Sequence, residues 1–190
     1  MAVVASAGSG AGRPAAAAPR LPILPSQLLG MSDRAAPWAP DYSGLVQRLA
    51  TLRLPAPSDV AYHVHAILHV YVDGRQVPVP AEIGIDQQEG VLAPLHTHDA
   101  SGVIHMEAVR PFPFRLADFF DVWGVVLTPT QLGGYRDHGA ERVHVYVDGR
   151  PLRMADPTQY VLRRHDNVVV AYGRDGSFPA LPSAAALAGL

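Results

Sequence analysis

Histidine is the residue type whose number and spacing point most directly to chemistry in this chain. The 190 residues include nine histidines and no cysteine. Five of the histidines lie in two short segments, one with His63 and His65 and the other with His96, His98 and His105. Neutral imidazoles are nitrogen ligands for divalent transition metals, and a site without sulfur suits Zn²⁺ or Cu²⁺. The pattern therefore predicts a site for one such ion.

His63 and His65 are predicted to project from one face of a β-strand. Apolar residues occupy every even position from Tyr62 to Val72, so the odd positions share the opposite face. The two imidazoles are therefore neighbours. Such a pair alone is more often a solvent-facing polar stripe than a metal site, so we treat these two histidines as additional ligands.

The second segment, Leu95-His-Thr-His-Asp-Ala-Ser-Gly-Val-Ile-His-Met-Glu107, contains three imidazoles within ten residues. Asp, Ser and Gly favour turns, so the stretch Asp99-Ala-Ser-Gly102 is predicted to fold His105 back towards the other two histidines. His96, His98 and His105 are therefore the predicted principal ligands. A carboxylate or a water would complete the coordination of the ion.

Asp99 and Glu107 are the carboxylates nearest to these histidines in the sequence. They are predicted to be metal ligands, partners that fix the tautomer of an imidazole, or, in an enzyme, general bases acting on a bound water. The other four histidines are expected outside the site, on the outer faces of hairpins or in solvated loops: His69, His138, His144 and His165.

Two helices and two hairpins are predicted around these segments. Asp41 is an expected N-cap for a helix that carries Leu45, Val46, Leu49 and Leu52 on one face and ends before Pro55. A second helix has Leu116, Phe119, Phe120 and Trp123 at helical spacing and ends at Gly124. Asp73-Gly74 predicts a hairpin after the strand that begins at Tyr62.

A seven-residue sequence occurs twice, as His69-Val-Tyr-Val-Asp-Gly-Arg75 and His144-Val-Tyr-Val-Asp-Gly-Arg150. A duplication and two hairpins with the same turn chemistry both explain the repeat. The order hairpin, helix, hairpin predicts an α+β fold, a β-grasp-like sheet of hairpins packed on one helix. A small β-barrel is the alternative, because further strands are expected between Ile83 and Glu107.

One domain is predicted over residues 41–173. Residues 1–40 are rich in Ala, Gly, Pro and Ser and are expected to form a disordered or processed leader, and residues 174–190 a disordered tail. No apolar stretch reaches the length of about 18 residues that crosses a bilayer. A net charge of −2 argues against a nucleic-acid partner.

Four segments resemble an uncharacterised family of bacterial and archaeal proteins, over about residues 49–173. They are His63-Val-His-Ala66, the thirteen residues from Leu95 to Glu107, Phe114-x-Leu-x-x-Phe-Phe-x-x-Trp-Gly124 and Val168-Val-Val-Ala-Tyr-Gly173. The resemblance implies that the histidine motif is one unit. Members often carry an anchor or export segment before the domain, which implies an extracytoplasmic location, with a cytoplasmic one as the alternative. The resemblance implies no function.

The chain departs from this family at two positions. Ile67 stands where members often have another histidine, and Gln131 lies near the place of a cysteine. The resemblance therefore implies fewer ligands in this chain.

Three functions remain open on these grounds. The first is binding or handling of a transition metal outside the cytoplasm, without catalysis. The second is a metal-dependent hydrolase or oxygenase, in which three histidines leave a coordination position open for water. The third is a β-grasp-like interaction module without metal, which requires well-separated imidazoles.

Overall fold

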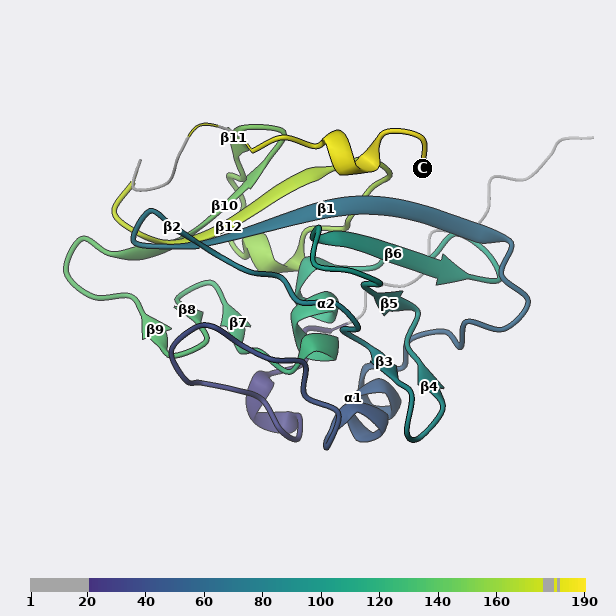
Figure 1. Cartoon of the computed structure of the whole chain (residues 1–190). Coiled ribbons are helices and arrows are strands. Elements are labelled where there is room, and N and C mark those ends of the chain that lie inside the picture. The colour runs from purple at the N-terminus through teal and green to yellow at the C-terminus, as the bar shows by residue number, and fades with distance from the viewer. Residues whose placement is uncertain (1–20, 176–179, 181) are drawn as a thin grey trace, which may run out of the picture.

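The computed structural model describes residues 21–175, 180 and 182–190. Its elements form a mixed α+β structure (Figure 1). The helical elements are η1 (Pro25–Gln27), α1 (Leu45–Leu52), α2 (Leu116–Trp123), η2 (Pro157–Gln159) and η3 (Ala185–Leu187). The strands are β1 (Tyr62–Val72), β2 (Arg75–Val77), β3 (Ile85–Asp86), β4 (Val91–Leu92), β5 (Leu95–His96), β6 (Val103–Ala108), β7 (Leu127–Thr128), β8 (Gln131–Leu132), β9 (Tyr135–Arg136), β10 (Arg142–Val147), β11 (Arg150–Pro151) and β12 (Asn167–Gly173).

The long strand β1 organises the main sheet, whose order is β11-β10-β12-β1-β6-β5, with β2 also paired to β1. The carboxyl half of β1 lies parallel to β12 and antiparallel to β2. Its amino half, from Tyr62 to Ile67, pairs with β6. The carboxyl half of β1 therefore lies between β12 and β2. The amino half extends the sheet through β6 towards β5.

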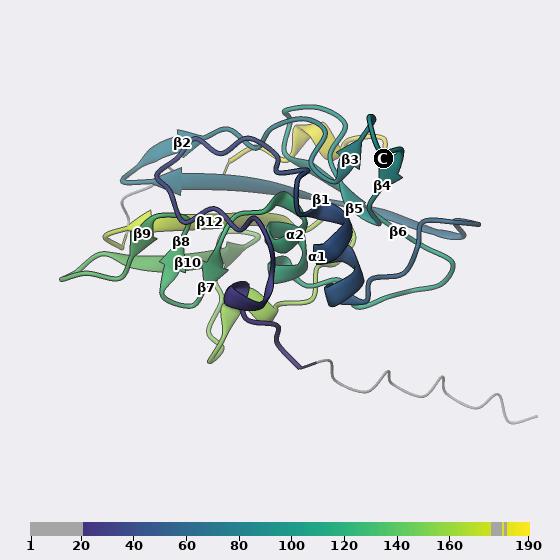
Figure 2. The ribbon, with the colours of Figure 1, turned by 90° about the horizontal axis from the view of Figure 1, so that it is seen from below.

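The main core fills the space between this sheet and α2. The even positions of β1, including Ala66, Leu68 and Val70, are buried there against Phe119 and Trp123 of α2. Helix α1 packs on α2 on the same side of the sheet (Figure 2). The odd positions of β1 therefore face away from the helices, as the alternation of the sequence predicts.

The predicted α+β class and the packing of hairpins against helices are confirmed. The alternative small barrel is wrong for the part of the chain that the structure describes, because its main sheet is open, with β11 at one edge and β5 at the other. Two helices, not one, lie on the helical side of the sheet (Figure 1). None of the described helices is long and apolar enough to cross a bilayer.

The hairpin predictions are confirmed at both copies of the repeat. Asp73 and Gly74 have φ of 48° and 76°, and Asp148 and Gly149 have φ of 51° and 74°, as a type I′ turn requires. The helix prediction at Asp41 is wrong in one detail. Helix α1 begins at Leu45 with Gly44 as its N-cap, and the Asp41 side chain instead accepts a hydrogen bond from the Gly44 N–H at 3.3 Å.

Residues 21–40 of the expected leader include positions that pack on the domain. Trp38 is buried edge-to-face against Trp123, with ring centroids 5.9 Å apart. Ser32 pairs with Val125 in an isolated β-bridge. Low sequence complexity hid these anchors, because one buried aromatic ring and one backbone bridge leave no periodic pattern in the sequence. The rest of the predicted leader, residues 1–20, lies outside the described residues.

Residues 182–190 of the expected tail also contact the domain. Leu187 of η3 is buried against Ile67 and Val103, on the sheet face opposite α2 (Figure 1). This small apolar cluster lies beside the histidines of β1 and β6.

Candidate metal centre

Three adjacent strands carry four of the five predicted histidines, and the fifth, His98, lies two residues after β5. In the register of the sheet, His65 of β1 lies opposite His105 of β6, and His105 lies opposite His96 of β5. His63 lies opposite Glu107. All of these positions are on the face of the sheet that turns away from α2. Sheet pairing therefore assembles a row of imidazoles from segments about 40 residues apart in sequence.

The turn between β5 and β6 contains the turn-forming residues predicted from the sequence, Asp99 to Gly102. Asp99 accepts a hydrogen bond from the Ser101 N–H at 2.9 Å, and Ser101 Oγ accepts one from the Val103 N–H at 3.2 Å. Gly102 has φ of 84°, and a Cβ there would collide with the Leu68 carbonyl. A glycine is therefore required for β6 to run against β1.

The histidine side chains form two sets of potential ligand atoms that share one residue. One set is His63, His65 and His105, and the other is His96, His98 and His105. Within each set, the ligand atoms lie within 4.8 Å of one another. The predicted principal ligands therefore do meet, and both additional ligands join His105 as well.

Three nitrogen–nitrogen distances within the sets are close to the distance between two nitrogen ligands of one metal ion. His105 Nδ1 lies 3.0 Å from His63 Nε2 and 3.1 Å from His65 Nε2. His96 Nε2 and His98 Nε2 are 3.3 Å apart. Two nitrogens bound at about 2.0–2.1 Å to a tetrahedral ion are roughly 3.3–3.4 Å apart. The side chains thus need little movement to accept an ion.

His96 is held in a defined tautomer. Its side chain is 1% exposed, and Nδ1 lies 2.9 Å from the Ala93 carbonyl, which can only accept a hydrogen bond. The proton of the neutral ring is therefore on Nδ1, and the lone pair of Nε2 points to the cluster. A carbonyl that orients a histidine in this way is typical of metal sites. Because the partner is a backbone atom, no sequence signal could have identified it.

The environment favours the neutral form of three of the imidazoles, those of His65, His96 and His105. Burial, followed by the charges that His65, His96, His98 and His63 would carry, lowers the pKa of His105 to about 3. Burial is also the main cause that lowers the pKa of His65 and of His96. A neutral imidazole offers the lone pair that a metal ion needs, whereas an imidazolium does not.

The two candidate carboxylates have different places. Glu107 Oε1 lies 3.4 Å from His63 Nε2 and 4.0 Å from His96 Nε2, at the cluster. The carboxylate of Asp99 is exposed and accepts its hydrogen bond within the turn, where Ser101 lowers its pKa. Of these two carboxylates, Glu107 is the one that lies within 4.0 Å of imidazole nitrogens of the cluster.

The remaining histidines stay outside both sets. His138 and His165 are exposed in loops, as expected. His69 and His144 lie on the face away from α2, as expected for the outer face of the hairpins. His69 is nevertheless buried, and its Nε2 has no hydrogen-bond partner. His144 Nε2 donates a hydrogen bond to the Gly173 carbonyl oxygen at 3.1 Å.

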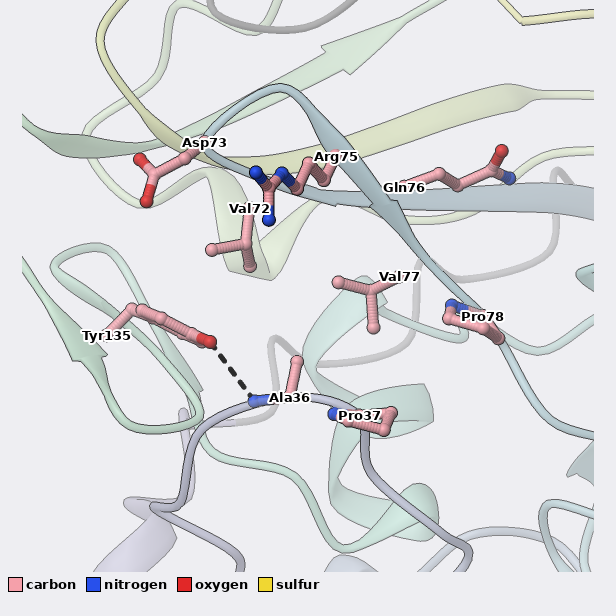
Figure 3. Close-up of a pocket in the computed structure, with 9 residues that line it drawn as sticks. All are labelled: Ala36, Pro37, Val72, Asp73, Arg75, Gln76, Val77, Pro78 and Tyr135. Atoms are coloured by element: carbon pink, nitrogen blue, oxygen red, sulfur yellow. Dashed lines mark hydrogen bonds between the residues drawn. The ribbon is translucent and has the colours of Figure 1, made fainter.

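Two cavities differ in their relation to the cluster. One of about 680 Å³ lies between the segment around Ala36 and the β1–β2 hairpin, where Tyr135 accepts a hydrogen bond from the Ala36 N–H (Figure 3). None of its drawn residues is a histidine. A smaller one of about 370 Å³ has His98, Glu82 and Asp86 in its wall. The second cavity thus opens beside a predicted ligand.

The five predicted ligands are therefore all assembled in one place, and Glu107 lies with them. The central position of His105, shared by both sets, was not expected from the sequence, because it depends on the pairing of β1 with β6 and of β6 with β5. Comparisons with family models, with curated proteins and with solved structures find no match for this chain.

Proposed function

We propose that this protein binds a divalent transition metal through its histidine cluster and serves in metal binding or handling outside the cytoplasm. The observation that carries the proposal is the His96, His98 and His105 set, with His96 locked so that its lone pair faces the other two. The rival interaction module required separated imidazoles and does not fit ligand atoms within 4.8 Å of one another. The location is proposed because members of the family that the sequence resembles often carry an anchor or export segment, although this chain shows no evident signal.

The chemistry of the donors supports Zn²⁺ or Cu²⁺ as the ion. The cluster offers imidazole nitrogen and one carboxylate, and the chain has no cysteine. Soft ions such as Cu⁺ favour sulfur ligands, whereas imidazole suits Zn²⁺ and Cu²⁺.

The test is direct metal binding by untagged protein. We expect wild-type protein purified without chelators to carry metal by elemental analysis, and the stripped protein to take up Zn²⁺ in competition with a chromophoric chelator. His96→Ala removes a buried ligand and should lower the affinity at least tenfold. His138→Ala removes an exposed histidine outside both sets and is the matched control. Less than a tenth of an equivalent in wild-type protein, before and after Zn²⁺ is offered, overturns the proposal.

A second candidate function, a metal-dependent hydrolase, is supported by the open side of the cluster. The His63 side chain is 43% exposed, and His98 is in the wall of the cavity with Glu82 and Asp86. An ion there keeps a position for water, which it would acidify, and Glu107 is placed to accept a proton. Hydrolysis of an activated ester by zinc-loaded protein, lost in both His96→Ala and Glu107→Gln, would favour this function over metal handling. Equal hydrolysis by wild type and variants would reject it.

A further inference from the structure

The two histidine sets define two positions for a metal ion, not one. Two ligands of the same ion are at most about 4.2 Å apart, twice the usual bond length of 2.1 Å. All pairs within each set lie within 4.8 Å, yet among the described residues the sets do not merge into one group of five. A single ion therefore cannot reach every nitrogen of the cluster.

His105 is the only residue common to both positions. Its Nδ1 faces His63 Nε2 and His65 Nε2 at 3.0 and 3.1 Å. Its ring centroid is 4.4 Å from that of His98 and 5.1 Å from that of His96, in the other set. An imidazole has a second nitrogen on the far side of the ring, so one ring can bond to an ion on each side.

Glu107 lies between the two sets and adds negative charge there. One oxygen of its carboxylate is 3.4 Å from His63 Nε2 in the first set and 4.0 Å from His96 Nε2 in the second. Two divalent ions repel each other, and a carboxylate between them reduces that repulsion. Its placement fits two ions better than one.

We propose that the cluster holds two divalent transition-metal ions bridged by the ring of His105, one with His63 and His65 and the other with His96 and His98. This inference rests on the proposed metal-binding function and extends it to a binuclear centre. As the second ion bonds to His105, the remaining N–H bond of the ring breaks and its proton leaves to water, so the ring bridges as an imidazolate. No electron is transferred in this step.

Stoichiometry and magnetic coupling test the proposal together. We expect stripped wild-type protein to bind two Zn²⁺ per chain. With Cu²⁺, the integrated electron paramagnetic resonance signal should grow up to one equivalent and fall between one and two, because an imidazolate bridge couples the two unpaired electrons. His138→Ala, a histidine outside the cluster, should behave as wild type.

Two half-site variants separate the positions at exposed residues, which protects the fold. His98→Ala should bind one Cu²⁺ through the set with His63, and His63→Ala one through the set with His96. Both should show a full, uncoupled signal, with unchanged circular dichroism. One equivalent in wild-type protein, or two equivalents with no loss of signal, would overturn the bridged pair while leaving the metal-binding function intact. No binding at all would overturn both.

Discussion

Two clusters of ionisable side chains lie on opposite sides of the main sheet and satisfy their charges differently. The histidine cluster, defined by its five imidazoles and Glu107, is on the face away from the helices. The arginine–aspartate cluster, defined as Arg48 of α1 with Asp41, Asp118 and Asp121, is on the helical side. Both take polar groups out of water, which costs free energy unless partners compensate.

The arginine–aspartate cluster contains its own cation. The Arg48 side chain is fully buried and donates to the carbonyls of Leu29 and Asp41 at 2.8 and 2.5 Å, and to that of Val122 at 3.3 Å. Its guanidinium also lies 3.8 Å from the Asp41 carboxylate. The positive charge therefore has acceptors on three chain segments, and it ties the segment around Leu29 to both helices.

The histidine cluster has lone pairs in excess and no cation of its own. Burial lowers the pKa of His65, His96 and His105, and Glu107 is the acidic side chain within this cluster. The two clusters therefore differ in whether the described chain itself supplies a cation. One contains an arginine whose terminal nitrogens donate to carbonyls of the described chain, whereas the other consists of groups that could hold a metal ion.

Replacing the internal cation should have the largest effect on stability. Arg48→Met leaves three carbonyls without their donor and the acidic residues without a counter-charge, so we expect a loss of about 3–5 kcal/mol in the free energy of unfolding. Chemical denaturation measures it. The exposed Arg110→Met is the control and should change stability by less than about 0.5 kcal/mol. A loss below about 1 kcal/mol for Arg48→Met would show that this cluster does not depend on its own cation.

Supplying the external cation should stabilise the other cluster. Free Zn²⁺ at 100 times its dissociation constant should raise the free energy of unfolding by about 2.7 kcal/mol, because it binds the folded chain. A chelator should reverse the gain. The measurement is denaturation with and without Zn²⁺ in wild type and in His96→Ala, which should lose most of the gain. Equal gains in both proteins would place the metal elsewhere.

The buried carboxylate Asp121 should make stability depend on pH. Burial, then the charge of Asp118, raises its pKa to about 8, against the opposing effect of Arg48. A carboxyl whose folded pKa is raised stabilises the fold fully below its unfolded pKa, near 3.8, and that stability is lost as pH rises through the folded value. Stripped protein should therefore become less stable from about pH 4 to pH 8 through this group. Asp121→Asn mimics the neutral acid and should flatten this decline; an unchanged slope contradicts the assignment.

The smallest effect is expected at Asp99, which is near the histidines but belongs to the turn. Asp99→Ala removes the hydrogen bond to the Ser101 N–H, which should cost about 0.5–1 kcal/mol and leave the number and affinity of bound metal ions unchanged. Glu107→Gln is the contrasting variant, which should weaken metal binding severalfold at little cost in stability. A drop in metal affinity for Asp99→Ala but not for Glu107→Gln would show that the acidic ligand is Asp99 in the turn and not Glu107 of β6.

Much of the site followed from local sequence alone. Alternation placed His63 and His65 on one face of β1, and the turn residues Asp99 to Gly102 returned β6 so that His105 meets His96 and His98. Helical spacing and the two Asp-Gly turns located α2 and both hairpins. These features depend on periods and turn geometries that extend over a few residues, which is why a single sequence determines them.

Only the tertiary structure decided how these pieces meet. The pairing of β1 with β6 made His105 the shared member of both sets, and the position of the Ala93 carbonyl fixed the tautomer of His96. The same holds for Trp38, whose burial against Trp123 gives structure to a segment of low complexity. Strand neighbours, register and backbone acceptors depend on contacts between distant residues, and those contacts form only when the whole core is packed. The sequence therefore determined which residues are candidate ligands, and the fold determined that they gather in two sets that share His105.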